Sequence, residues 1–327
     1  MRRLSANVMV LVLALAAMAF AAGCGEDDSK KKDEVDVTQG KDITIAVVTH
    51  GDGGSFWAVA KKGAEQAGKD QGVTVKYSEA NNDPQKQAQM IDAVVTEKVD
   101  GLAVSAPNPY AIKSSVQKAV KAGIPVIRLN SGAEEASSLG AITHVGQTET
   151  LAGEAAGEKL GAAGGKKMLC IIHEQGNIGL NQRCDGAKKG FGGEVENLQV
   201  KGTEDISTTL TEVESKLQSD KSVDSVLALN PDIAVAVRDA VKGASSDAKV
   251  ATFDLSGDVV KSIKSGEIQF AVDQQQYLQG YLPVVFLALF KTNANTVGGG
   301  QPVLTGPGFV DKANAATVEK LAEEGTR

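Results

Sequence analysis

Short β-branched runs alternate with segments of helical period along most of the chain, and this alternation constrains the fold more than any other feature. The first unit shows the pattern: the apolar run Ile43–Val48 ends at a glycine-rich turn, and from Phe56 small and apolar residues recur at helical spacing. Such runs are typical of strands buried on both faces of a parallel sheet. The alternation therefore predicts an α/β fold with right-handed crossovers.

The alternation occurs as two successive series. The first series predicts strands at Ile43–Val48, Val73–Tyr77, Leu102–Ser105 and Pro125–Asn130, with helices at Phe56–Lys69, Pro84–Lys98 and Pro109–Lys121. The second predicts strands at Lys167–His173, Leu198–Gly202, Ser225–Asn230, Val250–Asp254 and Gln269–Asp273, with helices near Thr148–Leu160, Asn181–Gly190, Thr208–Gln218, Ile233–Val241 and Asp258–Ile263. Two series of this length predict two doubly wound parallel-sheet lobes.

One late segment, Tyr281–Phe290, is too apolar to be left uncovered. The chain could cross back so that this helix packs on the first sheet, and Pro302–Val310 could then cross again. The helix could instead close the second domain. Periodicity alone does not decide between these arrangements.

The N-terminal residues predict export. Arg2 and Arg3 precede a run of apolar or small residues, Val8–Ala22, which is shorter than the about 20 residues of a membrane-spanning helix. Residues 1–23 therefore read as a cleavable signal peptide. The sequence Ala21-Ala22-Gly23-Cys24 is similar to a bacterial lipobox, which implies lipidation of Cys24; ordinary secretion is the alternative. Residues 24–40 have almost no apolar content and predict a flexible tether.

Charge and cysteine content limit the partners and ligands that the protein could bind. Without Arg2 and Arg3, the acidic residues exceed the basic ones by nine, which argues against a nucleic-acid partner. In an oxidising compartment Cys170 and Cys184 could form a disulfide, worth about 3 kcal/mol for a loop of about 15 residues, or could remain buried thiols. The chain has no Cys-x-x-Cys or His-x-x-x-His pair to suggest a metal.

A series of short motifs follows the strands in a specific order. They are His50-Gly51-x-x-x-Ser55-Phe56-Trp57, Asn81-Asn82-Asp83-Pro84-x-x-Gln87, Asp100-Gly101, Gly123-Ile124-Pro125-Val126, Asn181-x-Arg183-x-x-Gly186, Asn230, Phe253-Asp254 and Asp273-Gln274. In this order they resemble the type I periplasmic sugar-binding proteins, the ribose-binding-like receptors of ATP-binding-cassette (ABC) importers, from Lys41 to about Val310.

The resemblance implies two lobes joined by a hinge of three chain crossovers, near Thr143–Gly146, Val272–Gln274 and Pro302–Gly306. It also favours the arrangement in which the apolar helix crosses back. The N-terminal lobe would then comprise residues 41–143 and 275–303, and the C-terminal lobe residues 144–274 and 304–327. Such lobes close on a ligand like a hinged clamp.

The resemblance also implies a ligand site. Phe56 and Trp57 would pack against sugar C–H faces, and polar side chains would bind the hydroxyls. The polar candidates are His50, Asn130, Arg183, Asn230, Asp254 and Gln274. Asn130 stands where ribose-type members have aspartate, and Ser131 where they have arginine, so ribose itself is in doubt.

Each candidate also has a structural alternative. Phe56 and Trp57 could be core residues, and Arg183 a solvated surface charge. Asn230 and Asp254 could cap helices, and His50 could simply pack a loop. Gln274 lies in a run of three glutamines, so its assignment could be off by one. His144 and His173 are expected to be structural.

The sequence therefore predicts a binding protein that captures a small sugar or sugar alcohol between its lobes and delivers it to an ABC permease. It would act as an exported, lipid-anchored monomer at the outer face of the cell membrane or in the periplasm, without catalytic residues, cofactor or metal. A ligand sensor for a chemoreceptor or sensor kinase is the alternative. A nucleotide-dependent enzyme is disfavoured because Gly51–Phe56 lacks the third glycine of a dinucleotide-binding turn.

Overall fold

The computed structural model describes residues 42–133 and 137–327, and these residues belong to one compact unit. The predicted signal peptide, the lipidation site at Cys24 and the tether lie outside the described residues. Among the residues described, no helix has the length and apolar character needed to cross a membrane.

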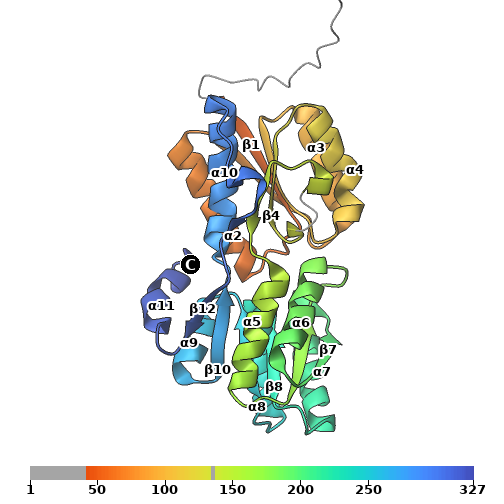
Figure 1. Ribbon diagram of the computed structural model, residues 1–327, viewed down its shortest axis with the longest axis vertical. Coiled ribbons are helices and arrows are strands. Elements are labelled where there is room, and N and C mark those ends of the chain that lie inside the picture. The colour runs from red at the N-terminus through yellow and green to blue at the C-terminus, as the bar shows by residue number, and fades with distance from the viewer. Residues whose placement is uncertain (1–41, 134–136) are drawn as a thin grey trace, which may run out of the picture. The chain divides into compact units, whose positions relative to one another are not determined.

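Six parallel strands form the first sheet, in the order β11-β5-β4-β3-β1-β2. Two helices cover each of its faces (Figure 1). On one face lie α2 (Ser55–Gln71) and α10 (Gln276–Asn293), and on the other α3 (Pro84–Glu97) and α4 (Pro109–Lys121). The strands are β1 (Thr44–Thr49), β2 (Thr74–Glu79), β3 (Gly101–Ser105), β4 (Val126–Asn130), β5 (Thr143–Gly146) and β11 (Val303–Leu304).

The second sheet repeats this plan in the order β12-β10-β9-β8-β6-β7, except that β12 runs antiparallel to β10. Its strands are β6 (Lys167–Ile172), β7 (Glu194–Gln199), β8 (Ser225–Ala228), β9 (Lys249–Phe253), β10 (Ile268–Asp273) and β12 (Gly308–Asp311). Its helices are α5 (Glu149–Ala162), α6 (Ile178–Phe191), α7 (Ile206–Ser219), α8 (Pro231–Gly243), α9 (Gly257–Ser265) and α11 (Ala315–Glu323). Short 3₁₀ segments are η2 (Ser137–Leu139), η3 (Gly202–Asp205) and η4 (Gly298–Gly300).

Side-chain alternation along the strands explains why both sheets are covered on both faces. In β1, Ile45 and Val47 join the hydrophobic cluster under α2 and α10, while Ala46 and Val48 join the cluster under α3 and α4. Successive side chains of a strand point to opposite faces, so a continuous apolar run needs a hydrophobic layer on each side. The two-lobe, parallel-sheet fold predicted from the sequence is confirmed.

The chain passes between the two sheets three times: after β5, after β10 and after β11. The apolar helix α10 follows β10 and packs on α2 and on the first sheet, as the cross-back arrangement requires. β5 runs to Gly146 and β11 to Leu304, so both strands of the first sheet extend past the lobe boundaries predicted at residues 143 and 303.

Two further elements differ from the sequence prediction. The strand predicted at Leu198–Gly202 lies earlier, at Glu194–Gln199, because it forms the edge of the sheet and its pattern of exposed and half-buried residues lacks an apolar run. Sequence analysis did not predict α11, which covers the end of the second lobe beside α9.

Candidate functional site

A buried cavity lies between the two lobes, and all eight ligand-binding residues predicted from the sequence line it. The first lobe contributes side chains at or after the ends of β1 and β4, and the second lobe those after β6, β8, β9 and β10. This is the carboxyl edge of each sheet, where open α/β folds bind ligands. The lining residues are His50, Phe56, Trp57, Asn130, Ser131, His173, Glu174, Asn177, Leu180, Arg183, Leu229, Asn230, Asp254 and Gln274.

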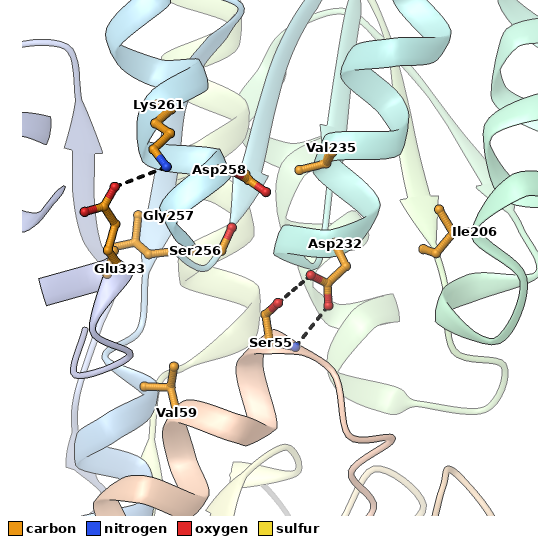
Figure 2. A pocket seen from close by; sticks show the side chains of 12 residues that line it. Ser55, Val59, Ile206, Asp232, Val235, Ser256, Gly257, Asp258, Lys261 and Glu323 are labelled. Atoms are coloured by element: carbon orange, nitrogen blue, oxygen red, sulfur yellow. Dashed lines mark hydrogen bonds and ion pairs between the residues drawn. The ribbon is translucent and has the colours of Figure 1, made fainter. Parts of the chain in front are cut away.

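A larger hollow of about 740 Å³ lies apart from this cavity, between the N-terminal turns of α2, α8 and α9 and the end of α11 (Figure 2). Its wall includes exposed and paired charges, such as Lys261 with Glu323. None of the eight predicted residues lines it. The interlobe cavity has a free volume of only about 30 Å³, but almost all of its lining side chains are buried and its polar groups converge, so it is the better candidate for the ligand site.

Among the described residues that line the cavity, Arg183 is the one permanent cation, and a buried carboxylate holds it in place. Its Nε donates a hydrogen bond to Glu149 Oε2 at 2.6 Å and its Nη2 donates one to Glu149 Oε1 at 3.1 Å. Arg183 is 4% exposed and Glu149 is 2% exposed. Nη1 donates to the carbonyl oxygen of Leu229, and the guanidinium lies 4.4 Å from the centre of the Phe253 ring. A solvated surface charge is thereby excluded for Arg183.

Small residues bring α5 and α6 close enough to form this pair. A Cβ added at Gly153 of α5 would overlap the backbone carbonyl of Arg183, and one at Gly186 of α6 would overlap that of Thr150. The predicted disulfide is present and joins Cys170 of β6 to Cys184 of α6, the residue after Arg183. Arg183 is thus fixed through the backbone on both sides.

An amide and a carboxylate, those of Asn130 and Asp254, enter the cavity from strand ends whose backbone is left-handed. Asn130, at the end of β4, has φ 63°, and Asp254, directly after β9, has φ 71°. Asn and Asp tolerate this conformation better than other non-glycine residues, and backbone strain of this kind clusters at functional sites. Burial raises the pKa of Asp254 to about 7.

A hydrogen-bonded chain of amides connects these side chains to the crossovers. Gln274 Nε2 donates to Asp254 Oδ1 at 2.7 Å. Gln279 Nε2 donates to Gln274 Oε1 at 2.9 Å and to Thr305 Oγ1 at 3.2 Å, and Asn130 Nδ2 donates to Gln279 Oε1 at 3.2 Å. Gln274 is the glutamine of the run that lines the cavity. Gln275 and Gln276 donate elsewhere, to the carbonyls of Thr305 and Leu255.

Glu174 lies between two histidines where the lobes meet. Its Oε2 is 3.6 Å from His50 Nε2 and its Oε1 is 3.6 Å from His173 Nε2. Burial lowers the pKa of both histidines to about 3 and raises the pKa of Glu174 to about 7. His50 Nδ1 lies 2.7 Å from Ser105 Oγ, which also accepts from the His50 backbone N–H. If Ser105 donates its hydroxyl proton to Nδ1, the imidazole hydrogen is on Nε2 and faces Glu174.

Two aromatic rings form the apolar wall. Phe56 and Trp57 are both buried, and their rings contact edge to face with 4.9 Å between the ring centres. The rings of Trp57 and His50 contact in the same way, with 4.7 Å between their centres. Both also belong to the core of the first lobe. The core and cavity-wall interpretations therefore hold together, because these residues occupy the first turn of α2, which the second lobe covers.

Asn230 likewise has two roles. Its Oδ1 accepts hydrogen bonds from the backbone N–H groups of Asp232 and Ile233 and so caps α8. Because the side-chain oxygen Oδ1 already accepts hydrogen bonds from the helix, a ligand in the cavity would receive a hydrogen bond from the Nδ2 amide of Asn230.

Sequence reasoning missed several lining or supporting residues. His173 was expected to be structural but lines the cavity, and Glu174, Asn177 and Ser131 do so as well. The positions of His173 and Glu174 directly after β6, at the carboxyl edge of the sheet, could have indicated this. Glu149 carried no local signal, because its role depends on the packing of α5 against α6.

Comparisons with known proteins agree with this geometry. The family model described as a periplasmic binding protein domain matches residues 45–291. The crystal structure of a carbohydrate transporter from Acidothermus cellulolyticus 11B, in complex with myo-inositol, is 44% identical; the match covers 87% of this chain and 99% of that chain, with a TM-score of 0.85. A solute-binding protein from Burkholderia graminis C4D1M, in complex with D-arabinose, is 25% identical over 85% and 98% of the two chains, with a TM-score of 0.76.

A sequence relative points the same way. The ribose import binding protein of Bacillus subtilis (strain 168) is 27% identical over 248 residues, which is 74% of this chain and 79% of that protein. These relatives are binding proteins and not enzymes. The fold, the interlobe cavity and the match over most of its length show that this chain belongs to the periplasmic binding protein domain family.

Proposed function

We propose that the protein captures a neutral cyclic polyol in the interlobe cavity and delivers it to an ABC importer, with myo-inositol as the first candidate ligand. The observation that carries the proposal is the convergence of hydrogen-bonding side chains from both lobes around two aromatic rings in one buried cavity. The 44% identical relative in complex with myo-inositol supports the choice of a cyclitol.

The chemistry of the cavity suits a ring of hydroxyl groups. Each hydroxyl both donates and accepts, so a buried polyol needs donors and acceptors around its whole edge. Arg183 has N–H groups beyond the three that Glu149 and Leu229 accept, and Asn230 offers its amide. Asp254 supplies acceptor oxygens, and the ring of Trp57 supplies an apolar surface for C–H groups.

Charge narrows the ligand class. Arg183 is already neutralised by Glu149, while Glu174 and Asp254 are two further acidic groups of the cavity. The part of the cavity lining that the structure describes therefore holds no uncompensated positive charge to receive a carboxylate or phosphate. Neutral cyclitols and sugars should bind in preference to uronic acids and inositol phosphates, because burying a second anion beside two acidic groups is costly.

Export and delivery complete the proposal. We infer that the protein acts outside the cytoplasm, anchored through a lipid on Cys24, with residues 24–40 as a tether and with lobe boundaries close to those that the sequence predicts. The lobes would close on the ligand as a monomer, and the closed form would be recognised by the permease because the ligand stabilises it selectively.

A thermal-shift screen tests the ligand class. The panel is myo-inositol, D-ribose, D-arabinose, D-allose, glucuronic acid and inositol monophosphate. A ligand at a hundredfold excess over its Kd stabilises the native state by about 2.7 kcal/mol. We expect myo-inositol to raise the Tm most and the two anions to leave it unchanged. A larger rise of the Tm with one of the two anions than with myo-inositol would contradict the proposal. So would the absence of a Tm shift with every neutral polyol of the panel.

A further inference from the structure

The first turn of α2 receives its capping carboxylate from the opposite lobe. The N-cap residue of α2 is Gly54, which offers no side chain, and the first turn holds no acidic residue. Asp232, in the first turn of α8, fills this place: its Oδ2 accepts from the Ser55 backbone N–H at 3.0 Å, and its Oδ1 accepts from Ser55 Oγ at 2.5 Å (Figure 2).

The local sequence leaves room for this contact. A Cβ at Gly54 would lie 3.0 Å from Asp232 Oδ2, so the residue without a side chain allows the carboxylate to reach the helix end. Beside it, Thr203 Oγ1 of the second lobe donates a hydrogen bond to Asp52 Oδ2 of the first. The backbone N–H of Ile178 donates to the carbonyl of Pro107 at a third interlobe contact.

Asp232 does not belong to the ligand cavity. It lines the outer hollows of the molecule, and neither it nor Ser55 is among the residues around the enclosed cavity. Its carboxylate lies near the N-termini of both α8 and α2, where the helix dipoles favour negative charge. Only the contact with α2 depends on the two lobes being together.

We propose that Asp232 is a positioning residue that sets ligand affinity by capping α2 only when the lobes are closed. Any interaction present in the closed state alone shifts the equilibrium between open and closed lobes. The apparent Kd depends on the fraction of protein that can close, so this interaction tightens binding without touching the ligand. The proposal rests on the ligand site proposed above, but it concerns a different part of the molecule.

The test compares Asp232→Ala and Asp232→Asn with the control Asp258→Asn. Asp258 lies in the first turn of the neighbouring helix α9 and lines the same outer hollow, but its side chain has no hydrogen bond to the first lobe among the described residues. Loss of this helix cap should change the equilibrium constant between open and closed lobes by about 5- to 30-fold. We expect Asp232→Ala to raise the Kd for myo-inositol by that factor, mainly through faster dissociation.

The conservative variant and the control sharpen the result. Asp232→Asn keeps an acceptor for the Ser55 N–H but loses the charge, so its Kd should lie between those of the wild type and Asp232→Ala. Asp258→Asn should change Kd by less than twofold. Equal effects of Asp232→Asn and Asp258→Asn, or a Kd and a dissociation rate of Asp232→Ala within twofold of the wild type, would overturn the proposal.

A measurement without ligand separates this proposal from the ligand assignment. Small-angle X-ray scattering of the ligand-free protein should show a larger radius of gyration for Asp232→Ala than for the wild type, and no change for Asp258→Asn. If the wild type binds no polyol, the ligand assignment fails while the scattering result still decides the role of Asp232. If the radius of gyration of Asp232→Ala equals that of the wild type, the proposed role of Asp232 is refuted.

Discussion

Removal of the Arg183 guanidinium should weaken both folding and ligand binding, and the two effects can be separated. In Arg183→Ala, Glu149 would remain 2% exposed without its cationic partner and would keep only the hydrogen bond from Gln147 Nε2 among the described side chains. Breaking a buried ion pair by removing one partner costs about 3–5 kcal/mol. We therefore expect the free energy of unfolding, measured by urea titration, to fall by about that amount.

A double variant isolates the role in binding. Replacing both partners with apolar residues of similar volume, as in Arg183→Met with Glu149→Leu, should restore most of the stability, because no buried charge is left unpaired. It cannot restore a charge-assisted hydrogen bond to the ligand, which is worth about 1.5–3 kcal/mol. The Kd, measured by isothermal titration calorimetry, should therefore rise about 10- to 150-fold.

The refuting result is specific. If the double variant recovers stability and also binds the ligand as tightly as the wild type, Arg183 has a structural role only. Glu149→Leu alone is the matched control: it leaves Arg183 in the cavity without its orienting carboxylate, and its affinity should fall as well.

Three further predictions concern the same region. Since burial raises the pKa of Asp254 and of Glu174 to about 7, the folded protein retains protons that the unfolded chain loses above about pH 4. This contribution to the free energy of unfolding falls as the pH rises from about 4 to 7, whereas the buried histidines, whose pKa is lowered to about 3, contribute a rise over the same range. Urea titrations of the variant with Asp254→Asn and Glu174→Gln should therefore show a free energy of unfolding that rises more steeply with pH than that of the wild type; parallel profiles would contradict this. Replacing Cys170 and Cys184 with alanine should lower the free energy of unfolding by about 3 kcal/mol, and an unchanged urea midpoint would argue against a disulfide in solution. Gly186→Ala should push α5 and α6 apart and lower both the Tm and the ligand affinity, whereas a wild-type Tm would show that the two helices are not in close contact.

Local patterns along the chain were enough to predict the two-lobe fold. The β-branched runs and the helical periods between them identify both sheets, because alternation of side chains along each strand follows directly from sequence. The edge strand Glu194–Gln199 was misplaced because an edge strand needs no continuous apolar run. The position of α10 was left open by periodicity, since a helix apolar enough to be buried carries no information about which sheet covers it.

The candidate site was predictable where a residue occupies a position that the family resemblance marks as ligand-binding. Asn130 and Asp254 meet this condition, and both lie in the cavity. Glu149 could not be predicted, because it faces Arg183 only through the close packing of α5 on α6. Asp232 escaped notice for the same reason: its partner, Ser55, is 177 residues away in the sequence and belongs to the other lobe.

The most direct test of the ligand site uses Trp57, the single tryptophan of the chain, which lines the cavity. Titration of the purified protein with myo-inositol should change the intrinsic tryptophan fluorescence along a saturable curve. The midpoint should match the Kd from calorimetry, because the only reporter lies where the ligand binds. Heat of binding without any change in Trp57 fluorescence, or no saturable binding of any neutral polyol, would contradict the assignment of this cavity as the ligand site.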